Sequence, residues 1–407
     1  MSTNRMRPIR ETISLDDARA LIAKHIRPVS RTERVRIDLG DGRVIACPVH
    51  ATSDVPPFAR AAMDGYAVRA ADTFGSGTHS ARVLRVVETV FTGQVPTRAV
   101  GEGDCTEIAT GAPVPDGADG VVMVEDTERD ADGTVRIFSP VYPGQNVTRQ
   151  GADIRSGQPV LAPGDVLNPS RIGALAALGV LDVEVYAQPR VAILSTGNEV
   201  VDPGTPLQPG HIYDINKFTL SAVLRQHGAL PVPQPTAADS IADLRHALER
   251  CLSEDVVLFS GGSSVGERDL ILDVVEQMGE VIFHGIAVKP GKPTLFGVIG
   301  GTPVFGMPGY PTSCLSNAYM LLIAPLRTMA RLPAWTPRTI ALPAGQRVVS
   351  TTGRHQFYTV KIVDGQAMPA FKASGDITSM SHADGYIEIP PQIDIVEKGQ
   401  LVDVRLF

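Results

Sequence analysis

The sequence contains few cysteines and no long apolar run, and these two absences narrow the class of protein. Its four cysteines (Cys47, Cys105, Cys251 and Cys314) lie far apart in a chain of 407 residues and form no C-x-x-C pair. This spacing favours buried free thiols in a reducing compartment over a disulfide framework. No stretch reaches the roughly 20 apolar residues of a membrane-spanning helix. The basic residues 1–10 lead into no apolar segment of the secretory type, so we expect a cytoplasmic protein.

Positive charge is not in excess either. The chain has 37 Lys and Arg against 44 Asp and Glu, which gives a formal net charge of −7. A mildly acidic chain has no overall attraction for nucleic acid or for anionic membranes, so an anion site has to be built locally. The length of 407 residues allows several domains, and the sequence shows no internal repeat or low-complexity tract. We therefore expect a multidomain protein that binds neither nucleic acid nor membrane.

A glycine-rich stretch in the second half of the chain predicts an anion site. Residues 256–259 (VVLF) form a short apolar run typical of a buried strand, and residues 268–278 have the apolar spacing of a helix. Between them, residues 260–264 (SGGSS) place small side chains where a strand passes into a helix. Backbone N–H groups in such a turn point outward, and the helix N-terminus adds partial positive charge, which favours phosphate. An ordinary glycine-rich turn is the alternative.

The apolar patterns predict a multidomain α/β plus β fold. Helix and strand patterns alternate between residues 190 and 330, which indicates a doubly wound, mainly parallel α/β sheet. Short strands between Gly and Pro turns indicate one all-β module over residues 83–147 and a second β domain after residue 335. The predicted helices cover residues 14–26, 169–178, 216–227, 240–252, 268–278 and 312–327, and the predicted strands of the α/β part cover residues 191–194, 256–259, 281–286, 294–298 and 304–307.

Three loops leave the carboxyl ends of the predicted strands, where open α/β sheets bind their ligands. These loops are residues 195–199 (STGNE), 260–269 (SGGSSVGERD) and 307–313 (MPGYPTS). A fourth segment, VKPGKP at 288–293, supplies Lys289 and Lys292, whose point charges suit phosphate or another oxyanion. We expect all four segments to meet at one edge of the sheet.

Four acidic residues are candidates for chemistry. Glu199 and Asp269 lie in the strand-end loops, where carboxylates suit a phosphate site if Mg²⁺ lies between them and the phosphate. Capping of a helix N-terminus is the alternative for each. Asp64 precedes Gly65 and Asp153 follows GA at 151–152, and the sequence allows a local Asx-turn at Asp64 and a plain surface aspartate at Asp153.

An ordered set of short motifs resembles the MoeA family of molybdopterin molybdenumtransferases, or molybdenum insertases, which includes the gephyrin E domain. Each motif is short, but the set runs in order through nearly the whole chain. The motifs are AMDGYAV (62–68), ATGAPVP (109–115), QGADI (150–154), STGNEV (195–200), FSGGSSVGERD (259–269), VKPGKP (288–293), MPGYPTS (307–313) and GRHQF (353–357).

The resemblance implies both an architecture and a reaction. It implies a segmented linker domain (1–50 and 151–187), an inserted β domain (51–150), a molybdopterin-binding α/β domain (188–333) and a C-terminal β-barrel-like domain (334–407). It also implies a homodimer that takes adenylylated molybdopterin and molybdate as substrates and releases AMP with Mg²⁺. A molybdopterin adenylyltransferase would donate the substrate. The active cleft would lie between the α/β domain of one subunit and the inserted domain of the other.

The matching motif positions imply a set of site residues. Asp64, Asp153, Glu199 and Asp269 would be catalytic, with Glu199 and Asp269 on the metal. Thr110 would act with Asp64 and Asp153 across the dimer, and Arg354 and Ser374 would add contacts from the C-terminal domain. The remaining substrate-binding positions are Gly261, Gly262, Ser263, Ser264, Lys289, Lys292, Pro308, Gly309, Pro311 and Ser313.

The sequence departs from the family pattern at two loops, and the C-terminal stretch ASGDI (373–377) fits that pattern loosely. Pro308 to Pro311 reads PGYP where the family usually has PGNP, so a phenol replaces an amide at Tyr310. Residues 196–199 read TGNE where the family usually has TGDE, so Asn198 removes one carboxylate. These departures leave open whether molybdate or tungstate is the oxyanion.

Three other functions compete with a molybdenum insertase. A molybdopterin adenylyltransferase has a similar α/β domain but consists essentially of that domain alone. A nucleotide-amide hydrolase on the same domain would lack the AMDGYA loop and the flanking β domains. A gephyrin-like scaffold would bind partners without turnover, but it has no need of Asp64, Glu199, Asp269 and both lysines.

Overall fold

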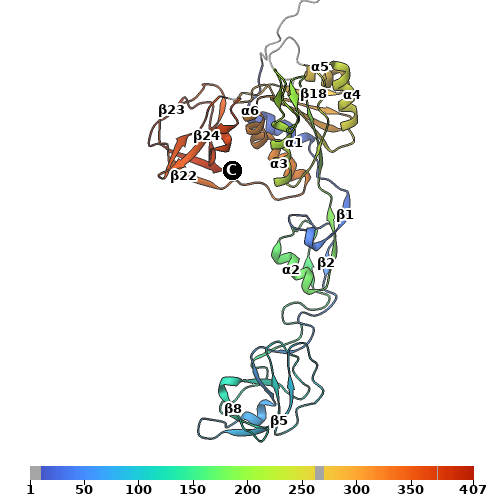
Figure 1. The fold of residues 1–407 in the computed structure, drawn as a ribbon, viewed down its shortest axis with the longest axis vertical. Helices are drawn as coiled ribbons and strands as arrows, with labels where there is room; N and C mark the ends of the chain where they lie inside the picture. Colours follow the sequence, from blue (N-terminus) through green and yellow to red (C-terminus); the bar gives the residue numbers. More distant parts are fainter. Residues whose placement is uncertain (1–10, 262–269, 374) are drawn as a thin grey trace, which may run out of the picture. The chain divides into compact units, whose positions relative to one another are not determined.

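The computed structural model describes residues 11–261, 270–373 and 375–407, and these form two compact units (Figure 1). The first, here called the α/β unit, comprises the described residues of 1–33, 42–44 and 185–407. The second, here called the β unit, comprises residues 34–41 and 45–184. Within the described residues, no helix has both the length and the apolarity needed to cross a membrane.

A six-stranded sheet forms the centre of the α/β unit. Every residue of its strand β17 is buried, as expected for a central parallel strand that is covered on both faces. The strands, in spatial order, are β16 (Leu230–Pro233), β13 (Arg190–Ser195), β17 (Val256–Ser260), β21 (Thr302–Met307), β20 (Leu295–Ile299) and β18 (Glu280–His284).

The sheet is parallel in its first four strands and antiparallel in its last two. The pairs β16–β13, β13–β17 and β17–β21 are parallel, but β21–β20 and β20–β18 are antiparallel. The sheet is thus mainly parallel, as predicted, but it is antiparallel at this end. The reason is local: only Gly300 and Gly301 join β20 to β21, and a two-residue loop connects antiparallel strands.

Helices cover both faces of this sheet, which confirms the doubly wound α/β class. Leu220, Leu224 and Cys314 belong to the core on one face, whereas Leu244, Leu248 and Val274 belong to the core on the other. The helices are α3 (Asn216–Gln226), α4 (Ile241–Cys251), α5 (Leu270–Met278), α6 (Pro311–Asn317) and α7 (Ile323–Met329), with a π-helical turn at Ala318–Leu322 inside the helix predicted over 312–327.

The N-terminal helix α1 (Leu15–His25) also packs in the α/β unit. The Ser14 hydroxyl caps it by accepting a hydrogen bond from the Asp17 N–H at 3.0 Å. Its buried face, including Ala18 and Ile22, joins the same core as Leu220. The core therefore groups α1 with the sheet, whereas the resemblance placed residues 1–50 in a linker domain.

The C-terminal residues form a second sheet that continues from the α/β part. Strand β19 (Val288–Lys289) pairs in parallel with β24, with Lys289 opposite Gln356. This pairing brings the predicted lysine segment beside the GRHQF motif. The strands in order are β19, β24 (His355–Val363), β26 (Gly385–Ile389), β28 (Leu401–Leu406) and β22 (Thr339–Pro343), with β25 (Gln366–Pro369) on β24 and a short helix α8 (Thr378–Ser381).

The β unit contains its own six-stranded sheet and one helix. The helix α2 (Pro169–Ala177), predicted over 169–178, is capped by Asn168, whose Oδ1 accepts from the Arg171 N–H at 2.9 Å. The sheet order is β7 (Gly120–Met123), β4 (Gly65–Val68), β6 (Asp104–Ile108), β5 (Arg82–Val90), β9 (Thr134–Ile137) and β8 (Thr127–Arg129).

The described residues of both units also form short two-stranded sheets. These pair β1 (Thr32–Arg36) with β12 (Asp182–Tyr186), β2 (Val49–His50) with β11 (Pro159–Leu161), β3 (Arg60–Ala61) with β10 (Val147–Thr148), β14 (Val200–Val201) with β15 (Ile212–Tyr213), and β23 (Val348–Val349) with β27 (Ile395–Val396).

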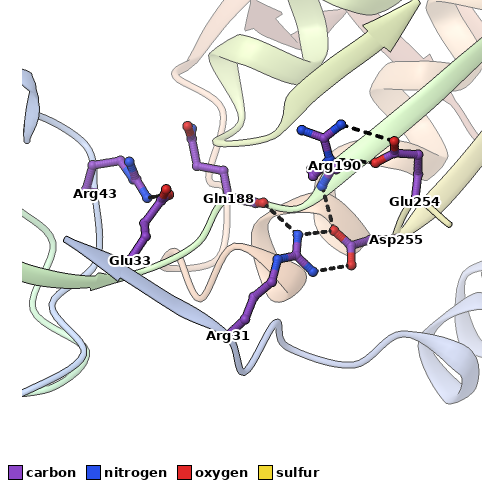
Figure 2. Close-up of polar contacts among 7 residues, drawn as sticks. All are labelled: Arg31, Glu33, Arg43, Gln188, Arg190, Glu254 and Asp255. Atoms are coloured by element: carbon purple, nitrogen blue, oxygen red, sulfur yellow. Dashed lines mark hydrogen bonds and ion pairs between the residues drawn. The ribbon is translucent and has the colours of Figure 1, made fainter. Parts of the chain in front are cut away.

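An ion-pair network holds the segments at the amino ends of β13 and β17 (Figure 2). The Arg31 guanidinium donates to both carboxylate oxygens of Asp255 at 2.6 Å, and to the Gln188 carbonyl at 3.2 Å. The Arg190 N–H donates to Asp255 at 2.7 Å, while its guanidinium pairs with Glu254. Burial by itself would raise the pKa of Asp255, but the hydrogen bonds from Arg31 and Arg190 outweigh it and hold that pKa below its usual value.

We expect Asp255→Asn to lower the free energy of unfolding by about 1–2 kcal/mol at neutral pH, because it removes the charge that orders Arg31. Because the folded-state pKa of Asp255 is depressed, this stabilisation is complete above about pH 4 and is lost as the pH falls through the folded-state pKa. Urea denaturation at several pH values measures the difference in free energy of unfolding between the wild type and Asp255→Asn. The exposed Asp403→Asn is the matched control. If the difference in free energy of unfolding between the wild type and Asp255→Asn stayed constant on acidification, Asp255 would not have a depressed pKa in the folded protein.

Candidate functional site

The three predicted strand-end loops meet at one edge of the central sheet. Strands β13, β17 and β21 are parallel neighbours, so their carboxyl ends lie side by side. The loops that follow them are residues 195–199, the segment from Ser260 onward, and residues 307–313. The prediction that they converge is confirmed for the described parts. Gly262, Ser263, Ser264 and Asp269 lie outside the described residues.

The backbones of these loops approach one another too closely for side chains. Gly261 has a φ of +110°, and a Cβ there would lie 2.4 Å from the carbonyl oxygen of Thr196. A Cβ on Gly309 would lie 3.4 Å from the Gly261 Cα, so the third loop touches the same turn. Glycine is therefore required at position 261 by both conformation and space.

Several buried polar atoms at this edge have no hydrogen-bond partner within the described parts of the chain. They include the hydroxyls of Ser195 and Thr196 and the side-chain carbonyl oxygens of Asn216 and Asn317. The amide nitrogen of Asn216 donates to the Gly309 carbonyl at 2.8 Å, so this side chain also holds the third loop. Buried polar groups are normally satisfied, so these atoms are available to a ligand or to water.

Glu199 is exposed at the edge, and its loop is tied to a fourth one. The Asn198 N–H donates to the Asp239 carboxylate at 3.2 Å, and the Asp239 N–H donates back to the Asn198 side chain at 3.3 Å. Asp239 follows β16, the outer parallel strand of the sheet. Sequence reasoning missed it, although it directly precedes Ser240, the N-cap of the helix α4.

The predicted cations lie where the C-terminal sheet begins. The Lys289 ammonium donates to the Thr351 hydroxyl at 2.8 Å, and the Arg354 N–H donates to the Thr351 carbonyl at 3.3 Å. The structure therefore joins Lys289 and the Arg354 segment through Thr351, which sequence reasoning did not single out. Ser374 lies outside the described residues.

The loop that carries Lys292 is held by a buried asparagine. Asn317 donates to the Gly291 carbonyl at 2.9 Å and to the Thr294 hydroxyl at 2.6 Å. Pro311 stands at the first turn of α6, and Ser313 is buried in that helix. These contacts fix the backbone on which Lys292 and Ser313 stand.

Asp64 and Thr110 are in direct contact within the β unit. The Asp64 carboxylate accepts hydrogen bonds from the Thr110 N–H at 2.7 Å and from its hydroxyl at 2.9 Å. These two bonds, the backbone one first, hold the pKa of Asp64 below its usual range. Both partners come from another loop, so the alternative of a local Asx-turn at Asp64 does not hold.

Asp153 lies on a neighbouring loop of the same unit. Its N–H donates to the Val55 carbonyl at 3.0 Å, and the nearby Asp54 carboxylate accepts from Gln150 and Ser156. Among the described residues, no hydrogen bond links Asp153 to Asp64 or to Thr110. Its role therefore stays a prediction.

The described carboxylates do not by themselves form a metal site. Across residues 11–261, 270–373 and 375–407, no group of three or more His, Cys, Asp or Glu side chains is placed to hold a metal ion. The exposed Glu199 still fits Mg²⁺, because this ion takes few protein carboxylates and completes its shell with phosphate oxygens and water.

The fold and the site define a multidomain α/β plus β protein in which three glycine-containing loops meet at the carboxyl edge of the central sheet. Three family models match consecutive parts of the chain: "MoeA N-terminal region (domain I and II)" over residues 13–179, "Probable molybdopterin binding domain" over 192–328 and "MoeA C-terminal region (domain IV)" over 341–407. The chain belongs to the MoeA family, as the motifs indicated.

Curated relatives and solved structures cover almost the whole chain. "Molybdopterin molybdenumtransferase 2" of Mycobacterium tuberculosis is 33% identical over 406 residues, covering 96% of this chain and 98% of the relative. The molybdopterin molybdenumtransferase of Haemophilus influenzae is 36% identical over 311 residues, 76% of each chain. A crystal structure of a MoeA protein from Pyrococcus horikoshii is 39% identical, with a TM-score of 0.83 over 97% of this chain and 99% of that one.

We expect Thr110→Val to raise the pKa of Asp64, because it removes the hydroxyl bond and leaves only the backbone bond to the carboxylate. Thr110→Ser keeps the hydroxyl and should leave the titration in place. NMR of the protein with carbon-13-labelled aspartate carboxyls measures the pKa of Asp64 directly. The variant Asp64→Asn assigns its signal. Equal shifts in both variants would show that the hydroxyl does not hold Asp64.

Proposed function

We propose that this chain inserts molybdate into adenylylated molybdopterin and releases AMP. One observation carries the proposal: the turn at Gly261 and the exposed carboxylate of Glu199 lie in loops at one edge of the central sheet, and Lys289 lies in the segment that joins its strands β18 and β20. A substrate with a phosphoanhydride and an oxyanion needs these three chemistries. The relatives named molybdopterin molybdenumtransferase support the same reaction class.

Each group has a physical task in this proposal. Backbone N–H groups of the glycine turn bind the phosphates of the substrate, because no Cβ blocks their approach. Lys289, oriented by Thr351, and Lys292 attract molybdate as point charges. Glu199, together with Asp269, would hold Mg²⁺, which neutralises phosphate charge as the AMP leaves.

The direct test is incubation with adenylylated molybdopterin, Mg²⁺ and either molybdate or tungstate. We expect AMP release and formation of active cofactor, with the preferred oxyanion given by the faster of the two reactions. Activity with ATP and metal-free molybdopterin would instead support an adenylyltransferase. Partner binding without any turnover would support a scaffold.

We expect Lys289→Ala to weaken molybdate binding about tenfold, because the substitution removes a held ammonium from the oxyanion site. Wild-type binding should fall with added salt, since the Debye length is about 8 Å at physiological ionic strength. Thr351→Val should give a smaller loss, because the charge stays but its hydrogen bond is gone. The exposed Lys361→Ala is the matched control for calorimetric titration. If molybdate affinity changed neither with added salt nor with Lys289→Ala, the role of this lysine would be structural.

We also propose that the active unit is a homodimer in which Asp64 completes the site of the other subunit. This proposal rests on the family resemblance and on the side-chain contact of Asp64 with Thr110. In a mixture of Asp64→Ala and Glu199→Gln subunits, half of the dimers are mixed, and one site in each is intact. Up to about a quarter of wild-type activity should then return, by two-fold symmetry. No recovery after proven subunit exchange would place Asp64 elsewhere.

A further inference from the structure

Tyr310 occupies a fixed position at the edge where the three loops meet. It follows β21 and stands directly before Pro311, the first residue of α6, with φ −66° and ψ 129°. Its carbonyl accepts from the Cys314 N–H at 2.9 Å, and the preceding Gly309 carbonyl accepts from Asn216 at 2.8 Å. The backbone is thus held on both sides of the residue.

The side chain itself projects away from the protein core. Tyr310 is 66% exposed, and within the described parts of the chain its phenol oxygen has no hydrogen-bond partner and no aromatic ring packs against it. A single exposed aromatic residue is ordinary on a protein surface. Its place is what distinguishes Tyr310, because the adjacent Gly309 touches the Gly261 turn.

A second glycine lies along the edge of the Tyr310 ring. A Cβ on Gly375 would lie 3.7 and 3.9 Å from two carbon atoms of that ring, so a small residue leaves this flank open. The Thr312 hydroxyl bonds the Asp376 carbonyl at 3.1 Å and lies 3.3 Å from the Ser379 hydroxyl. These contacts tie the segment after Gly375 to the turn that carries Tyr310, so Gly375 is held beside the Tyr310 ring.

We propose that the ring of Tyr310 stacks on a planar nitrogen heterocycle of the substrate, an inference that rests on the proposed function. The substrate class has two such heterocycles, the adenine and the pterin. An aromatic face beside a phosphate turn binds them through dispersion and ring electrostatics. The family pattern usually has an asparagine at this position, so this stacking contact is a binding feature of this particular chain.

Binding measurements with small probes separate the two heterocycles. Calorimetric titration would use AMP, neopterin phosphate and, as a probe without a ring system, ribose 5-phosphate. We expect Tyr310→Leu to weaken binding of one heterocycle about tenfold, as stacking energies imply, and Tyr310→Phe to stay within about twofold of wild type. Ribose 5-phosphate should bind all variants equally. A loss confined to AMP assigns the adenine, and a loss confined to neopterin phosphate assigns the pterin.

A matched control and a kinetic measurement complete the test. Tyr142, which is also 66% exposed but belongs to the β unit, serves as the control in Tyr142→Leu. With adenylylated molybdopterin, Tyr310→Leu should raise KM and keep kcat, while Tyr310→Phe should change neither.

The inference and the proposed function fail in different ways. Equal affinity and KM in wild type and Tyr310→Leu overturn the stacking contact while leaving the insertase function intact. An equal loss for ribose 5-phosphate also overturns it, since the substitution would then act on the phosphate turn. Absence of AMP release by the wild-type protein overturns the proposed function itself, and with it the substrate assignment of Tyr310.

Discussion

The candidate site depends on one steric constraint, the contact of backbone with backbone at the carboxyl edge of the central sheet. A side chain at position 261 would lie 2.4 Å from the Thr196 carbonyl oxygen, and Gly309 touches the same turn. Because no Cβ lies between these loops, the three strand ends form one continuous polar surface. The hydroxyls of Ser195 and Thr196, which have no partner among the described residues, are buried just beneath these loops.

Around this turn, the structure places charge by tying separate elements together. Asp239 holds the Glu199 loop through a reciprocal pair of hydrogen bonds with Asn198. A second carboxylate at position 198 would face Asp239, so the neutral amide lowers the negative charge of this loop beside an anion site. Thr351 orients Lys289 from the C-terminal sheet. Negative and positive groups therefore reach the site from different segments, each fixed by its own partner.

Much of the fold followed from local sequence patterns. The helices that begin at Ser14, Asn168 and Ser240 followed from their apolar patterns, and in each a short polar side chain satisfies a free N–H group of the first turn. The buried strand β17 followed from its run of apolar residues. The strands β18 and β20 were also predicted, but not their direction, because an apolar run has no information on strand direction. Only the two-glycine loop before Thr302 indicated it.

The sequence by itself determined the elements, the glycine turn and the family, because propensity, capping and motif order are properties of neighbouring residues. Only the tertiary structure decided which side chains act together. Asp64 with Thr110 and Lys289 with Thr351 are separated by 46 and 62 positions in the chain. Such pairs form because strand pairing and core packing bring loops together that are distant in the sequence. A pattern of neighbouring residues does not predict which distant loops will meet. For this reason the sequence predicted roles for Asp64 and Lys289, whereas their partners in space, and the exposed position of Tyr310, came from the fold.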